Sequence, residues 1–139
     1  MKLMEELTDE IIHFFNRLAS WEASVVRGSD VTVSEAHAIE ILGQYGTMNM
    51  KELAQKLGVT TGTTTVTVDR LEKKNYAFRQ MNPDDRRVNM ISLTDEGQKA
   101  FEEHHHYHQK LTEQLFSILS EKEAQQFLDT LKKINSEII

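Results

Sequence analysis

Apolar side chains recur every three or four residues along most of this chain, and that spacing is typical of amphipathic helices. The first such segment covers residues 3–27 and carries a broad apolar face: Leu3, Leu7, Ile11, Phe14, Phe15, Leu18, Val25 and Val26. The same spacing predicts further helices over residues 34–45, 49–57, 60–74, 95–119 and 121–137. The fold is therefore expected to be mainly α-helical.

One stretch breaks the helical pattern and predicts two short strands, near residues 77–81 and 87–93. VNMIS, residues 88–92, alternates apolar and polar positions, as half-buried strands do. NPDD, residues 82–85, lies between the two segments and holds the only proline of the chain, which indicates a turn. We therefore expect a β-hairpin after the fourth helix.

Residues that cap helices mark where these elements begin. The expected N-caps are Ser34, Asn49, Thr60, Thr94 and Ser120. In KLGVTT, residues 56–61, Gly58 permits a sharp reversal just before Thr60 caps the next helix. Two helices joined by so short a turn and followed by a hairpin predict a winged helix-turn-helix.

The second helix of a helix-turn-helix enters the major groove of DNA, with its N-terminal residues nearest the bases. Here Thr64, Val68 and Leu71 are three or four residues apart and are expected to face the core. The predicted DNA face then consists of the cap and the remaining outward positions: Thr60, Thr61, Gly62, Thr63, Thr65, Val66 and Arg70. This face offers hydroxyls and methyl groups but little charge, which favours phosphate contacts, thymine methyl contacts and DNA shape.

The hairpin places two arginines, Arg86 and Arg87, at its tip. A narrow minor groove attracts an inserted arginine, so these residues are expected to contact DNA. Asp85 precedes Arg87 by two residues and is expected to brace it through a charge-assisted hydrogen bond.

The charge distribution supports a nucleic-acid partner, although the net charge of the 139-residue chain is −6. Residues 49–94 hold eight Lys/Arg and five Asp/Glu, whereas the rest of the chain holds eight and seventeen. A basic module therefore lies within an acidic frame. The absence of cysteine excludes disulfides and thiolate metal sites, and no apolar run is long enough for a bilayer, so a cytoplasmic protein is expected.

VSEAHAIEIL, MNMKELAQKLGVTTGTTTVTVDRLEKKNY and NPDDRRVNMISLTDEGQ together resemble the MarR family of bacterial transcription regulators over nearly the whole chain. The resemblance implies a homodimer on pseudo-palindromic DNA, with residues 60–70 in the major groove and Arg87 in the minor groove. It also implies a helical dimerisation region, residues 1–30 and 95–139, around a DNA-binding region, residues 31–94. Two positions depart from the family: Asn75 replaces a common glycine, and Val66 replaces a polar or basic residue.

FEEHHHYHQK, residues 101–110, places His104 and His108 four residues apart on one face of the predicted helix. Paired histidines at this spacing can bind one metal ion, and Glu22 and His37 are the further candidate ligands. The chain resembles the zinc-uptake repressor branch of the family at these positions. RGSDVTVSEAHAIEILG and HHHYH are also similar to the fatty-acid-biosynthesis repressor branch, which implies an acyl chain on acyl carrier protein as effector.

Three interpretations of this group stay open: a hydrogen-bonded structural contact between helices, a zinc site, or a switch surface beside a small-molecule pocket. No cofactor is certain, and zinc is the one candidate. The sequence contains no nucleophile motif, phosphate-binding loop or HExxH motif, so no enzyme is expected. The predicted function is a DNA-binding regulator, expected to be a repressor of fatty-acid synthesis genes or, alternatively, a zinc-responsive repressor. A winged helix that binds only protein is the remaining class.

Overall fold

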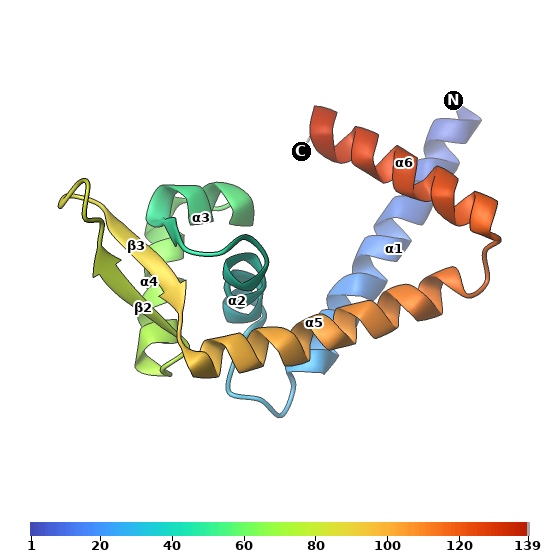
Figure 1. Cartoon of the computed structure of the whole chain (residues 1–139). Coiled ribbons are helices and arrows are strands. Elements are labelled where there is room, and N and C mark those ends of the chain that lie inside the picture. Colours follow the sequence, from blue (N-terminus) through green and yellow to red (C-terminus); the bar gives the residue numbers. More distant parts are fainter. Residues whose placement is uncertain (139) are drawn as a thin grey trace. The chain divides into compact units, whose positions relative to one another are not determined.

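The computed structural model describes residues 1–138, which form two compact units that meet between His104 and His105. In chain order the elements are α1 (Lys2–Val26), α2 (Val33–Tyr45), β1 (Met48–Asn49), α3 (Met50–Leu57), α4 (Thr61–Lys73), β2 (Ala77–Met81), β3 (Asn89–Leu93), α5 (Asp95–Phe116) and α6 (Glu121–Glu137) (Figure 1). The prediction of a mainly helical fold with a winged helix-turn-helix is confirmed. Among the described helices, none combines the length and apolar character needed to cross a membrane.

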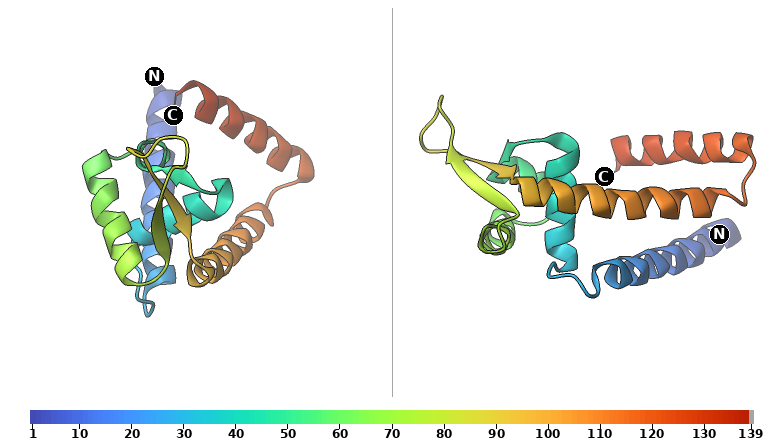
Figure 2. Two further views of the ribbon diagram at one scale, coloured as in Figure 1. Left: turned by 60° about the vertical axis from the view of Figure 1, so that its left-hand side comes forward. Right: turned by 60° about the horizontal axis from the view of Figure 1, so that its bottom comes forward.

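The sheet of the first unit has three strands in the order β1-β3-β2, all antiparallel. β2 and β3 form the predicted hairpin, in which Ala77 pairs with Leu93 and Met81 with Asn89. Its tip projects beyond the helix-turn-helix (Figure 2). β1 was not predicted, because Met48 and Asn49 are too few residues to show an alternating pattern.

The core of the first unit lies between the helix-turn-helix and the sheet. Its largest fully buried apolar side chains are Ile39, Leu53, Val68, Leu71 and Ile91, from α2, α3, α4 and β3. Two glycines let α5 approach this core closely. A Cβ at Gly43 would lie 2.2 Å from the Phe101 ring, and a Cβ at Gly97 would lie 1.9 Å from the Tyr76 carbonyl oxygen.

Most helix boundaries follow the predicted caps. Asn49 accepts a hydrogen bond from the Glu52 amide at 2.8 Å, Thr60 from the Thr63 amide at 3.1 Å, and Thr94 from the Gly97 amide at 3.0 Å. Ser120 and Glu123 form the predicted capping box. The cap of α2 was predicted wrongly. Thr32, not Ser34, accepts the Glu35 amide at 3.2 Å, because the chain is still extended at Thr32 and already helical at Ser34.

The second unit contains the end of α5, a short turn and α6. The rings of Phe116 and Phe127 lie 5.4 Å apart and join the two helices across the turn. The predicted helix over residues 95–119 ends earlier, at Phe116, since the Ser117 and Leu119 amides bond to carbonyls three residues back. The predicted boundaries at residues 30 and 94 separate a dimerisation region from a DNA-binding region and do not follow these compact units, so they remain a prediction.

The close approach at Gly97 predicts that Gly97→Ala destabilises the fold by about 1–3 kcal/mol, because a backbone carbonyl cannot rotate away from the new methyl group. The measurement is the free energy of unfolding in urea at fixed protein concentration. Gly62→Ala is the matched control. The nearest atom there is 3.9 Å away, so this variant is expected to gain about 0.5–1 kcal/mol from helix propensity. Equal stability of the Gly97→Ala and native proteins would contradict the prediction.

Candidate nucleic-acid interface

The turn between α3 and α4 sets the direction of the second helix. Gly58 adopts the left-handed conformation with φ 72°, and its amide bonds to the Ala54 carbonyl at 2.9 Å. Thr60 then starts α4. Thr64, Val68 and Leu71 are buried as predicted, and Thr67 joins them on the same face. α4 is therefore held by one face, which leaves the opposite face of the helix for contact with a partner.

The opposite face of α4 carries the residues predicted to meet DNA. Thr60, Thr61, Gly62, Thr63, Val66 and Arg70 are exposed, and Thr65 is half-buried. The Thr65 hydroxyl donates to the Thr61 carbonyl at 2.8 Å, so its outer side offers a methyl group and oxygen lone pairs. Thr60 donates to the Thr63 oxygen at 3.0 Å.

Arg79 joins the wing to α4, a contact that the sequence analysis missed. From β2 its guanidinium donates to Glu72 at 2.5 Å and to Asp69 at 2.6 Å, both on α4. The contact pairs two carboxylates beside the exposed face of the helix with one cation, which reduces their combined negative charge. It also fixes the hairpin relative to α4 through two charge-assisted bonds. Its partners lie seven and ten residues before it, so no local motif could have indicated them.

The tip of the wing contains the predicted contact between Asp85 and Arg87. Arg87 donates through Nε to Asp85 Oδ1 at 3.1 Å and through Nη2 to Oδ2 at 3.2 Å. The bonds from the Arg87 side chain and amide lower the pKa of the Asp85 carboxyl. Although it is paired, the Arg87 side chain is 89% exposed. Arg86 is exposed beside it.

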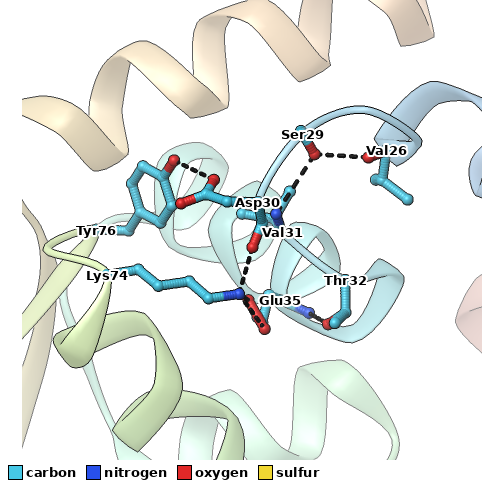
Figure 3. A network of polar contacts seen from close by, with 8 residues as sticks. All are labelled: Val26, Ser29, Asp30, Val31, Thr32, Glu35, Lys74 and Tyr76. Carbon is cyan, nitrogen blue, oxygen red and sulfur yellow. Dashed lines mark hydrogen bonds and ion pairs between the residues drawn. The ribbon is translucent and has the colours of Figure 1, made fainter.

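A polar network connects the end of α4 to the loop before α2 (Figure 3). Lys74 donates to both carboxylate oxygens of Glu35, at 2.9 and 2.7 Å, and also to the Asp30 carbonyl. Glu35 is only 1% exposed. The Tyr76 hydroxyl donates to the Asp30 carboxylate at 2.6 Å. This hydrogen bond, followed by burial, raises the pKa of Tyr76 to about 12.

The structure places three of the four residues of the predicted metal or effector group in the first unit. His37 Nε2 contacts Glu22 Oε2, which links α2 to α1. Donor atoms of Glu22 and His104 lie within 4.8 Å of each other, and His104 is 8% exposed. His108 follows one turn later on the same face of α5 and is half-buried. His37 therefore orients the Glu22 carboxylate, while His104 faces it.

A model described as the MarR family matches residues 31–88, which run from the start of α2 to the wing. The chain is 30% identical over 125 residues to the HTH-type transcriptional repressor MdtR of Bacillus subtilis, covering 90% of this chain and 81% of that protein. The chain belongs to the MarR family. It is accordingly a DNA-binding transcriptional regulator and not an enzyme.

Solved MarR-family structures share the fold. The Streptococcus pneumoniae FabT structure, in complex with DNA, is 26% identical with a TM-score of 0.86 and covers 96% of this chain and 95% of that chain. A MarR family protein from Bacillus stearothermophilus is 23% identical with a TM-score of 0.86, covering 99% and 96%. The MarR-type winged helix predicted from the sequence is confirmed by these likenesses.

The network around Asp30 predicts a pH-dependent stability. The raised pKa means that the folded protein favours the protonated Tyr76 phenol. This contribution is complete below the ordinary pKa of 10.0 and is lost as the pH rises towards about 12. Tyr76→Phe is expected to lower the free energy of unfolding by about 1 kcal/mol at neutral pH. Urea titrations at several pH values measure the difference in the free energy of unfolding between the native and variant proteins. This difference should disappear as the pH approaches about 12; a difference that does not change with pH would contradict the prediction.

Proposed function

We propose that the protein is a repressor that binds a pseudo-palindromic operator as a homodimer and acts in the cytoplasm. Thr60, Thr61, Gly62, Thr63, Thr65, Val66 and Arg70 would contact the major groove, and Arg86 and Arg87 would contact the backbone or the minor groove. The observation that carries this proposal is the wing. Arg87 is almost fully exposed, yet its guanidinium is held by two bonds from Asp85. An oriented, exposed arginine loses less conformational freedom when it enters a groove.

The pairing of acids in the winged helix also favours an anionic partner. Arg79 is paired with both Asp69 and Glu72, and Asp85 is engaged by Arg87. Arg70 and Lys73 are exposed on α4, and Lys51 and Lys56 are exposed on α3. A duplex that approaches α4 and the wing therefore meets exposed cations beside carboxylates that are paired with arginine, and this arrangement supports a strong salt dependence of binding.

A homodimer is supported by apolar surface that each unit leaves exposed. In α1 no residue is buried, and the exposed large apolar side chains are Leu3, Met4, Leu7, Ile11, Ile12, Phe14 and Phe15. In α6 they are Phe127, Leu128, Leu131 and Ile134. Amphipathic helices with uncovered apolar faces are stabilised by a partner, and helix-turn-helix dimers match two half-sites about one DNA turn apart.

The regulated genes are proposed from the resemblance alone. RGSDVTVSEAHAIEILG and HHHYH, together with the likeness to FabT, favour genes of fatty-acid synthesis and an acyl-chain effector. A ligand-bound relative shows that small molecules bind this fold: NadR was solved in complex with 4-hydroxyphenylacetate, at 21% identity. That likeness concerns the fold and does not identify an effector of this chain.

A zinc-responsive repressor is the second candidate function, and the arrangement of Glu22 and His104 favours it. Carboxylate oxygen and imidazole nitrogen are both zinc ligands, and His108 on the next turn would supply a third. In this proposal His37 acts on the Glu22 carboxylate rather than on the metal, since a ligand is commonly oriented by a hydrogen-bonded neighbour. The same contacts also fit the structural interpretation, so metal binding needs a direct test.

The proposed DNA contact predicts that Arg87→Ala weakens binding to a duplex selected from a random library. The affinity of the native protein for this duplex should fall steeply as the salt concentration rises. In a plot of log K against log salt, the slope of the variant should be smaller in magnitude by about one, because one cation that contacts the duplex is lost. At saturation each duplex should hold two chains. Arg17→Ala, at an exposed position of α1, is the control and should keep the native slope. No duplex binding by the native protein at low salt would overturn the proposed function.

The zinc alternative predicts that the purified protein binds zinc stoichiometrically and that His108→Ala weakens this binding by about 10-fold or more. Elemental analysis and calorimetric zinc titration measure the binding, and duplex affinity with and without zinc measures its consequence. His13→Ala, which changes an exposed histidine of α1, is the matched control. If zinc leaves the duplex affinity of the native protein unchanged, the zinc function is wrong and an acyl-type effector remains.

A further inference from the structure

Gly62 has no role inside the folded chain that requires a glycine. It lies in the first turn of α4 with ordinary helical backbone, and it is absent from the residues with positive φ. A Cβ there would meet only the Thr60 hydroxyl, at 3.9 Å. Glycine weakens a helix interior relative to alanine. The fold therefore does not account for a glycine at this position, whereas close approach of a partner to the helix backbone would.

Val66 lies one turn after Gly62 on the same line of α4 and is 48% exposed. It is the one large apolar side chain on the exposed face of this helix. Gly62 has no side chain, so the residue four positions before Val66 adds nothing that could cover it. The exposed valine methyl groups therefore lie next to a bare stretch of helix backbone.

Thr65, which precedes Val66, offers no free hydroxyl proton. Its hydroxyl donates to the Thr61 carbonyl, so Thr65 presents a methyl group and oxygen lone pairs. Asp69, three residues after Val66, is paired with Arg79, and Arg70, four residues after it, is the exposed cation of this face. A base edge placed against Val66 on the side of Thr65 therefore meets methyl groups and an acceptor.

We propose that Val66, with Thr65, selects a thymine in each operator half-site through its 5-methyl group, and that Gly62 provides the clearance for this contact. The proposal rests on the proposed function, since it requires α4 to lie in the major groove. Among the major-groove edges of the four bases, only thymine carries an apolar group. The paired adenine offers an amino donor, which fits the oxygen lone pairs of Thr65. The other base edges would leave polar atoms against valine without a partner, which is unfavourable.

The test uses the full-length protein and a duplex obtained by selection from a random library. Each thymine of a half-site is then replaced in turn by deoxyuridine, which removes the 5-methyl group and keeps the pairing. At one position per half-site the affinity of the native protein should fall by about three- to fivefold, the effect of burying one methyl group. The Val66→Ala protein should bind the original duplex more weakly and should be insensitive to deoxyuridine at that same position.

Val59→Ala is the matched control, because Val59 is 45% exposed but lies in the turn before α4. This variant should retain the native sensitivity to deoxyuridine. Gly62→Ala should lose affinity for the selected duplex without any fall in the midpoint of unfolding, which separates clearance for DNA from folding. Thermal unfolding of Val66→Ala checks that this exposed substitution leaves the fold intact.

Two results would overturn the proposal while leaving the proposed function in place. The native protein could bind a selected duplex specifically and be indifferent to deoxyuridine at every position. Alternatively, Val66→Ala could keep the full sensitivity, which would assign the methyl contact to another residue. Failure to bind any duplex would instead overturn the proposed function, and the thymine proposal with it. If α4 bound another protein through Val66 and the native protein bound no duplex, both the proposed function and the thymine proposal would be overturned.

Discussion

The buried carboxylate of Glu35 is the constraint on which the position of α4, the helix proposed to read DNA, depends. A carboxylate excluded from water is tolerated only when a cation and hydrogen bonds compensate it. Lys74 supplies both and reaches Glu35 from the residue that ends α4. The same ammonium group bonds to the Asp30 carbonyl, and Asp30 in turn accepts the Tyr76 hydroxyl just before β2. One ion pair thus ties the start of α2, the end of α4 and the start of the wing.

The strands of the wing are held against α4 by a second contact. Arg79 crosses from β2 to two acids on α4, so the hairpin and the helix are fixed relative to each other by side chains as well as by the core. Apart from Thr60, which caps α4, the residues of α4 proposed to read DNA have no part in these contacts. Gly62, Val66 and Arg70 are exposed, whereas Thr64, Val68 and Leu71 hold the helix. A recognition face can therefore change its chemistry without loss of the fold, because the two functions occupy opposite sides of one helix.

The features predicted from the sequence are those encoded over a few residues. Asn49, Thr60 and the Ser120–Glu123 pair each cap a helix through contacts three residues apart, and the alternation of VNMIS needed only its own five positions. Even at this range the local sequence did not show whether Thr32 or Ser34 caps α2, and the cap is Thr32. The Asp85–Arg87 contact was predicted for the same reason, since the two residues are neighbours in the turn.

The contacts that the sequence did not indicate join residues that are far apart in the chain and meet only in the folded protein. Lys74 meets Glu35 across 39 positions, and Arg79 meets Asp69 across ten. β1 exists only because Met48 and Asn49 pair with Ile91 and Met90 of β3. Glu22 and His37 were predicted to lie in one group with His104 and His108, with a hydrogen-bonded contact, a metal site and a switch surface left open. The structure contains a direct contact between Glu22 and His37, and the role of the group in binding stays a prediction.

The first turns of α2 carry one residue from each of two polar contacts in the first unit. His37, which contacts Glu22 of α1, is two residues from Glu35, which binds Lys74 at the end of α4. A ligand, proton or metal ion that changes the position of Glu22 acts on the same helical segment that holds the recognition helix. Such an effector can shift the DNA-binding equilibrium only by the difference in its affinity for the two arrangements of that segment. Any coupling from Glu22 to α4 would therefore pass through α2, by way of the Glu22–His37 contact.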